Sequence, residues 1–331
     1  MPSTKTFLEA TLDAVSEEMR RDERVFAIGE DSGIRGGSFP IFRGIEEEFG
    51  RERLIGTPIC EGATVNAAVG AAMTGMRPIV GLHFGDFMLR AVDEIGDQAA
   101  RSRYTFGGQC SVPIVIRAFD GVVNSAGPQH AGAYESIFAH FPGLRVVVPS
   151  VPRDAKGLLK SAIRDDNPVV FLEHKKLLNT RGEVPDGEYL VPLGEAEVKR
   201  EGSDLSIICY GIMVLRALEA AETLADEGIE AEVLDLRTLS PLDTGAIAGT
   251  VEKTGRVVVA HESPRHAGFG AEVAATIAEI AYAALRAPII RVAGRDVPVP
   301  FSPPLEAAVV PSVGDVTAAA RSVMSYSSTV A

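Results

Sequence analysis

The sequence has few cysteines and no apolar run long enough to suggest a membrane span. Its three cysteines, Cys60, Cys110 and Cys209, are odd in number and far apart, and its start, MPSTKTFLEATLDAV, lacks the basic and apolar segments of a signal peptide. We therefore expect reduced thiols and a cytoplasmic protein. The longest uncharged runs are too short, or too rich in Gly, Thr and Asn, to cross a bilayer, so we expect no membrane partner.

Basic residues are also scarce, with 32 Lys and Arg against 45 Asp and Glu, for a net charge of −13. Such a surface repels a phosphate backbone, so we expect no nucleic-acid partner. The sequence contains no Walker motif, no GxSxG and no plausible Cys/His dyad. His261 and His266 have the wrong spacing for a zinc helix, and Pro264 lies between them, so we reject a zinc site there.

The length of 331 residues predicts two domains, and apolar runs alternate with helical patterns along the first of them. We expect strands at 25–29, 78–84, 113–119, 145–150 and 168–173. We expect helices at 5–20, 61–76, 86–103, 132–140 and 153–164. In the helix 86–103, Leu89, Val92, Ile95 and Ala99 would share one buried face. Continuous apolar strands separated by helices predict an α/β fold, with a parallel sheet covered on both faces.

A polar stretch with Gly and Pro, 174–203, breaks this pattern, and a second α/β unit follows it. We expect a first domain at 1–180, a linker at 181–195 and a second domain at 196–331. The expected helices of the second domain are 213–227, 244–252, 270–284 and 314–326.

Glu61 is the only charged residue between Thr57 and Arg77, in the stretch TPICEGATVNAAVGAAMTGMRP. The small and apolar residues that follow it predict a helix packed on most sides. An acid in a first helical turn gains about 0.3–1 kcal/mol from the helix dipole, which is one explanation. However, a buried, unpaired carboxylate costs several kcal/mol unless it takes a proton or finds a donor. Glu61 is therefore a candidate for proton chemistry with a bound ligand.

Two histidines and one glycine-rich turn are further candidates. His130 follows a strand in a loop rich in Gly, Ser and Asn, where α/β proteins bind ligands. His83 ends the apolar run PIVGLHF and is either a core histidine or a ligand contact. GFGAEV at 268–273 lacks the third glycine of the dinucleotide fingerprint, so a close-packed turn is the preferred interpretation.

Several motifs, in order along the chain, resemble one family. They include GEDSGIRGGSFPIFRGI, the stretch that carries Glu61, DFMLRAVDEIGDQAARSRYTFGGQ, GPQH, EVLDLRTLSPLD, HESPRHAGFGAEV and RVAGRDVPVP. From about residue 5 to residue 325 the chain is similar to the beta subunit of the decarboxylating first component of 2-oxo acid dehydrogenase complexes. The family includes pyruvate, branched-chain 2-oxo acid and acetoin dehydrogenases. The resemblance implies a pyrimidine-binding domain, a transketolase-type C-terminal domain, and an α2β2 assembly with thiamine diphosphate at each α/β interface.

The resemblance also assigns roles to residues. Glu61 matches the glutamate that hydrogen-bonds the cofactor's aminopyrimidine ring, and Phe87 matches an aromatic position beside that ring. His83 stands near the pyrimidine, where many members have Met or Gln. His130 matches the histidine associated with acyl transfer. Positions that ligate a structural potassium ion in some members, largely by backbone oxygens, are matched by Ile114, Ala162, Ile163, Asp165 and Asn167.

The sequence lacks the GDG motif that such enzymes use to hold magnesium and the diphosphate; only FDG at 119–121 and PDG at 185–187 occur. We therefore expect an α subunit to supply those contacts. The expected function is that of one half of a thiamine-dependent 2-oxo acid dehydrogenase, pyruvate or acetoin type favoured, with acyl transfer to a lipoyl group on an acyltransferase core. One alternative is a structural and docking subunit whose partner performs catalysis. Another is a nicotinamide-binding dehydrogenase that uses GFGAEV.

Overall fold

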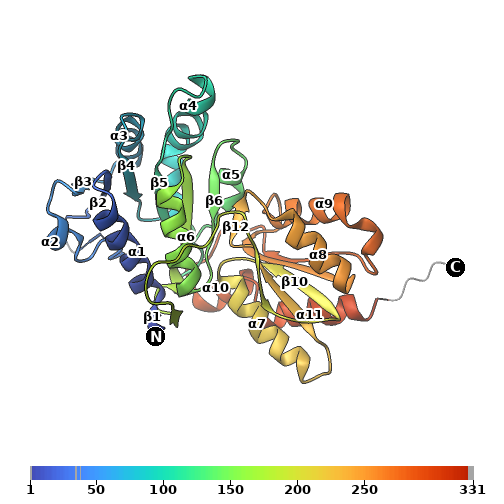
Figure 1. The fold of residues 1–331 in the computed structure, drawn as a ribbon. Helices are drawn as coiled ribbons and strands as arrows, with labels where there is room; N and C mark the ends of the chain where they lie inside the picture. Colours follow the sequence, from blue (N-terminus) through green and yellow to red (C-terminus); the bar gives the residue numbers. More distant parts are fainter. Residues whose placement is uncertain (1, 34–35, 38, 327–331) are drawn as a thin grey trace. The chain divides into compact units, whose positions relative to one another are not determined.

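The computed structural model describes residues 2–33, 36–37 and 39–326, which form two compact units (Figure 1). The first unit contains the chain up to Asp120 together with Ile137–Leu193, and the second contains Gly121–Ser136 together with the chain from Gly194 onward. The final change of unit therefore falls near the end of the expected linker. Residues 121–136 fall within the predicted first domain, whereas in the structure they pack with the second unit.

Six parallel strands of the first unit lie in the order β6-β7-β5-β4-β2-β3, which confirms the predicted parallel sheet. Their bounds are β2 Val25–Glu30, β3 Leu54–Thr57, β4 Arg77–Gly81, β5 Val115–Asp120, β6 Arg145–Val147 and β7 Val169–His174. Most of their side chains are buried, as expected of strands covered on both faces. Arg117 on β5 and Glu173 on β7 form a fully buried pair, with Nη2 2.8 Å from Oε1 and Nε 2.9 Å from Oε2.

Helices α1 and α6 pack against each other (Figure 1), and α3 packs on β2 and β4. The helices of this unit are α1 Phe7–Arg21, α2 Ile45–Phe49, α3 Glu61–Met73, α4 Ala100–Thr105, α6 Pro152–Arg164 and the short η3 Lys175–Leu177. The short helix α5 Glu135–Ala139 spans the change between the units. Strand β1 Ser3–Thr6 pairs antiparallel with β8 Arg181–Val184, so the two ends of the first unit lie together.

The expected helix at 86–103 is confirmed as one helical segment, but it is not a regular α-helix. The segment begins as a 3₁₀ helix, η1 Gly85–Ala91, passes through an α-helical step at 92–93 into a π-helix, η2 Glu94–Ala99, and continues as α4. Leu89 is exposed, and the buried side chains between Gly85 and Ile95 are those of Asp86, Met88 and Ala91. The π turn brings Gly96 against Phe141, since a Cβ at Gly96 would lie 2.6 Å from that ring.

Within the single chain, helix α3 is buried on one face, and packing of its other face against a partner subunit stays a prediction. Glu61, Thr64, Val65, Ala68, Val69 and Ala72 are buried. Ala63, Asn66, Ala67 and Gly70 are exposed. Three of these four exposed residues are Ala or Gly, so the side chains on this face are small.

The second unit contains a five-stranded sheet in the order β14-β13-β10-β11-β9, in which only β9 is antiparallel to its neighbour. The strands of this unit are β9 Glu197–Arg200, β10 Leu205–Cys209, β11 Ala231–Asp235, β12 Thr238–Ser240, β13 Val257–Pro264 and β14 Ile290–Gly294. Its helices are α7 Ile212–Ala225, α8 Thr244–Thr254, α9 Gly270–Ile280, η4 Tyr282–Ala284, α10 Pro303–Val309 and α11 Val313–Met324. Helices α7 and α11 share a hydrophobic core with β10, β11 and β13 (Figure 1). In the described part of the chain, no helix has both the length and the apolar character needed to cross a bilayer.

Candidate active-site residues

The candidate residues of the first unit gather where β2, β3 and β4 end. These strands pair in parallel, with Gly29 opposite Gly81 and Glu30 opposite Thr57. Their carboxyl ends therefore meet at one edge of the sheet, where α/β proteins place ligands. Glu30 is the last residue of β2, His83 follows β4, and Glu61 begins the helix that follows β3.

Glu30 is the residue that the sequence analysis missed. Its side chain is buried, and neither carboxyl oxygen has a hydrogen-bond partner within the described ranges. Burial, followed by the nearby charge of Glu61, raises the pKa of Glu30 to about 7. The sequence signal was weak, because an acid followed by Asp31 in GEDSG resembles an ordinary turn.

His83 is held by Glu30. Its Nε2 lies 3.2 Å from the backbone oxygen of Glu30, and its Nδ1 lies 3.6 Å from Oε2 of the same residue. Both ring nitrogens thus face one residue. The sequence left two interpretations of His83 open, a core histidine or a ligand contact. The structure adds a third, in which His83 orients the carboxyl group of Glu30.

Glu61 is 5% exposed at the first position of α3, and the N-cap residue Cys60 makes no side-chain cap there. The nearest cation is Arg90, whose Nε lies 4.0 Å from Glu61 Oε2 and whose side chain is 78% exposed. Solvent screening makes such an exposed partner weak. A buried acid with a distant partner is suited to hydrogen bonding or proton exchange with a bound group.

Phe87 belongs to an aromatic cluster near the same strand ends. Its ring meets that of Phe84 edge-on, with centroids 5.7 Å apart, and Phe84 meets Phe39 at 5.3 Å. Phe39 in turn lies 4.2 Å from Phe119, at the end of β5. These rings can form an apolar wall for a planar ligand.

His130 lies in the loop Gly121–Ser136, which belongs to the second unit, whereas Glu61, His83 and Phe87 belong to the first. The loop is held at several points. The backbone N–H of Val122 donates to Glu262 Oε1 at 2.8 Å, and that of Ser125 donates to Glu306 Oε2 at 2.9 Å.

The predicted potassium ligands were Ile114, Ala162, Ile163, Asp165 and Asn167. In the structure, Arg77 donates from Nε to the oxygen of Ile163 at 2.9 Å and from Nη2 to the oxygen of Asp165 at 2.6 Å. The side chain of Asp165 accepts from the backbone and amide of Asn167, both at 2.8 Å. A guanidinium therefore already supplies positive charge to two of these carbonyls.

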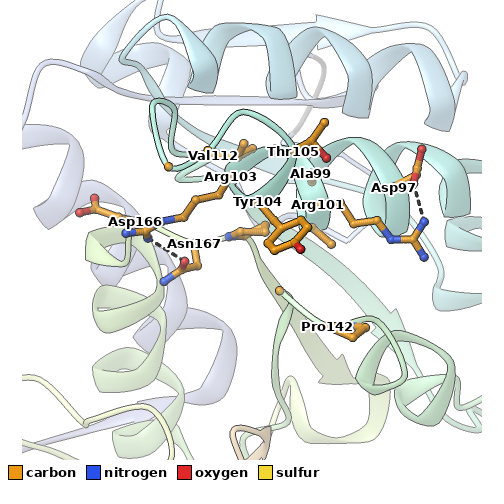
Figure 2. A pocket seen from close by; sticks show the side chains of 15 residues that line it. Asp97, Ala99, Arg101, Arg103, Tyr104, Thr105, Val112, Pro142, Asp166 and Asn167 are labelled. Atoms are coloured by element: carbon orange, nitrogen blue, oxygen red, sulfur yellow. Dashed lines mark hydrogen bonds and ion pairs between the residues drawn. The ribbon is translucent and has the colours of Figure 1, made fainter.

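A cavity of about 1080 Å³ lies elsewhere in the first unit, beside α4 (Figure 2). Arg103 extends across its lining to the side chain of Asn167 at 3.0 Å, and Arg101 pairs with Asp97 at 2.6 Å (Figure 2). Asn167 lines this cavity, whereas Glu30 and Glu61 do not. The acids at the strand ends and this cavity are therefore separate features.

Two family models match the chain. Residues 3–181 match the transketolase pyrimidine binding domain, and residues 194–316 match the transketolase C-terminal domain. The first match ends at Arg181, the first residue of β8, and the second match begins at Gly194.

Curated relatives of similar length are almost half identical. The beta subunit of acetoin:2,6-dichlorophenolindophenol oxidoreductase from Cupriavidus necator is 48% identical, covering 94% of this chain and 95% of the relative. The beta subunit of the pyruvate dehydrogenase E1 component from Bacillus subtilis is 46% identical, covering 97% and 99%. The beta subunit of 2-oxoisovalerate dehydrogenase from Bacillus subtilis is 45% identical, covering 98% and 100%.

Solved structures share the fold. A split-gene transketolase, described as an inactive beta4 tetramer, superposes with a TM-score of 0.79 at 24% identity, covering 96% of this chain and 97% of that one. A transketolase from Pichia stipitis has a TM-score of 0.69 at 15% identity, covering 97% and 46%. At these identities the likeness concerns the fold alone.

Proposed function

Because the chain belongs to the family of beta subunits of the E1 components of 2-oxo acid dehydrogenases, we propose that it forms half of such an enzyme, with pyruvate or acetoin as the favoured substrate. The partner is an α subunit, and the acyl group passes to a lipoyl group carried by an acyltransferase core. The observation that carries the proposal is the pair of buried acids, Glu61 and Glu30, at the strand ends of the pyrimidine-binding domain.

The proposed cofactor is thiamine diphosphate, and the residues present fit its pyrimidine ring. Glu61 offers a carboxyl with no close cation, and Phe87 belongs to an aromatic cluster near the same strand ends. When bound, the cofactor supplies an electron sink for cleavage of the bond next to the substrate carbonyl. Glu61 would hold the hydrogen bond to the ring, and its low-dielectric surroundings strengthen that bond.

Glu30 and His83 support Glu61 in this proposal. With a pKa of about 7, Glu30 holds a proton near neutral pH, which removes one of two competing buried charges. His83, which faces Glu30 with both ring nitrogens, limits the positions that the Glu30 side chain can take.

The proposal also includes two metal ions, magnesium and potassium. Magnesium and the diphosphate would be held by the α subunit. A potassium ion would share the carbonyls of Ile163 and Asp165 with Arg77, which the second lone pair of each carbonyl allows. A higher thermal midpoint in KCl than in NaCl would support potassium, and equal midpoints would oppose it.

Reconstitution tests the proposal. The purified chain is assayed alone and with the α subunit, thiamine diphosphate and magnesium, against pyruvate, acetoin and 2-oxoisovalerate. We expect turnover only from the reconstituted enzyme. Full turnover by the isolated chain would overturn the two-subunit assignment. Equal turnover by the wild type and by Glu61→Gln would favour the docking-subunit alternative instead.

A further inference from the structure

The loop that carries His130 is attached to the second unit by carboxylates on both sides of the histidine. Before it, Val122 and Ser125 donate their backbone N–H groups to Glu262 and Glu306. After it, Glu135 accepts hydrogen bonds from side chains of the same unit.

Glu135 is 1% exposed, and its Oε1 accepts from the hydroxyl groups of Tyr210 and Ser263, each at 2.6 Å. The hydroxyl of Ser263 has one hydrogen, which this bond uses, so its oxygen must accept from His261 Nδ1 at 2.9 Å. Burial, followed by the charge of Arg291, lowers the pKa of His261 to about 4, so the ring is neutral at pH 7. The hydrogen on His261 is therefore on Nδ1, and the bonds run in one direction toward Glu135.

Glu262 and Glu306 are themselves fixed in the second unit. Arg216 on α7 donates from Nη1 to Glu262 Oε2 at 3.2 Å and to the backbone oxygen of Pro311 at 2.6 Å. Glu306 lies on α10 and is 6% exposed. These buried acceptors make charge-assisted bonds to backbone N–H groups, which are stronger than bonds between neutral groups.

The loop backbone is also constrained between its anchors. Asn124 and Ser125 have positive φ values of 29° and 64°, a conformation that side chains other than glycine seldom adopt. Gly127 lies directly against Phe301, since a Cβ there would stand 2.4 Å from the ring. The N–H of Gly121 donates to the oxygen of Gly132 at 2.8 Å and closes the loop. Strained backbone of this kind persists only where its surroundings hold it.

We propose that Glu135, Glu262 and Glu306 are positioning residues, which hold the His130 loop to the C-terminal domain and so set the location of His130 for acyl transfer. The inference rests on the proposed role of His130 in that step. It gives the C-terminal domain a direct part in the reaction, because the loop is fixed by two carboxylates of that domain, Glu262 and Glu306, and by hydroxyl groups of that domain that donate to Glu135 of the loop.

Hydrogen exchange on the intact chain tests the anchoring without any activity. Glu262→Ala and Glu306→Ala should raise amide exchange in residues 121–136 roughly tenfold or more, because each removes a charge-assisted acceptor. The Gln variants, which keep an acceptor oxygen, should restore most of the protection. The control is Glu232→Gln, a carboxyl in the same unit that is 2% exposed and bonds Thr250 and Lys253 rather than the loop. Unchanged exchange in both Ala variants would overturn the anchoring.

Kinetics of the reconstituted enzyme then test whether the anchored loop positions His130 for acyl transfer. Reduction of 2,6-dichlorophenolindophenol reports the steps before acyl transfer, and acylation of a free lipoyl domain reports the transfer itself. We expect the ratio of lipoyl acylation to dye reduction to fall about tenfold in Glu306→Ala and at least as far in His130→Ala, and to stay constant in the Glu232→Gln control. A constant ratio in His130→Ala would refute the proposed role of His130, whatever the exchange result. A reduced ratio in His130→Ala with a constant ratio in Glu306→Ala would refute the positioning role alone.

Discussion

The imidazole Nδ1 of His83 lies 3.6 Å from Oε2 of Glu30, beside the ends of two neighbouring parallel strands. This pair answers the question that His83 raised as a sequence position. The histidine contacts a buried acid that has no hydrogen-bond partner for its carboxyl group among the described residues. The next acid, Glu61, is close enough to help raise the pKa of Glu30.

The first prediction concerns the pH dependence of stability. The folded-state pKa of Glu30, about 7, lies above its ordinary value of 4.5, so its contribution to folding is fully present below pH 4.5 and is lost as the pH rises through 7. The Glu30→Gln variant has no ionisable group at this position, so it does not lose stability in this way. The free energy of unfolding of the variant, relative to wild type, should therefore rise by about 3 kcal/mol between pH 4.5 and pH 8, at roughly 1.4 kcal/mol per pKa unit. Urea titrations across this range measure it; parallel curves would contradict the buried-acid assignment.

The second prediction concerns Glu61. Glu61→Gln in the reconstituted enzyme should reduce kcat by roughly 10² or more, because the variant loses the carboxyl that is proposed to hydrogen-bond the pyrimidine ring of the cofactor. The isolated variant should unfold within a few degrees of wild type, since the amide occupies the same volume. The matched control is Glu48→Gln. Glu48 belongs to the same unit and forms an exposed ion pair with Arg20, so we expect this variant to keep the wild-type kcat.

The third prediction concerns the buried pair of Arg117 and Glu173. Glu173→Ala should destabilise the chain by about 3–5 kcal/mol, because it leaves an uncompensated guanidinium inside the sheet. Replacing both partners, as Arg117→Met with Glu173→Leu, should recover most of that loss. Chemical denaturation of the two variants and the wild type gives the comparison. Equal stability of the single and double variants would show that the pair is not the source of the cost.

The fourth prediction concerns His261. Its folded-state pKa of about 4 lies below its ordinary 6.5, so its contribution to stability is fully present above pH 6.5 and is lost as the pH falls from 6.5 toward 4. Wild type should therefore lose stability over this range more steeply than His261→Asn. Histidine NMR provides a direct check, because the His261 ring signal should not titrate above pH 5. A midpoint near 6.5 would mean that the ring is not buried neutral.

The strands were predictable because runs such as PIVIRAF and PVVFLE are continuous, bounded by proline, and buried on both sides. The buried face of the helix at 86–103 was not predictable, because spacings of three and four residues fit both Leu89 and Met88 as buried positions. Gly96 of the π turn lies against Phe141, which is distant in sequence. The pattern of nearby residues cannot predict a contact between residues so far apart in the sequence.

Among the site residues, Glu61 was visible because a charge stands out in a run of small residues. Glu30 was not visible, since its burial depends on β3 and β4, which pair on either side of β2. The sequence also did not predict that His130 and Glu61 belong to different units. That separation depends on Glu262 and Glu306, more than a hundred residues further along the chain than the loop that they bind.

Residues 121–136 belong to the second unit although they lie between two segments of the first, and this affects protein synthesis and fragment design. The ribosome completes residues 121–136 before Tyr210, Glu262 and Glu306 exist, so this loop must wait for these hydrogen-bond partners. A gene divided after Leu193 would leave the loop on one polypeptide and its binding carboxylates on the other. Two such fragments would have to meet before either could bury the polar groups that they share.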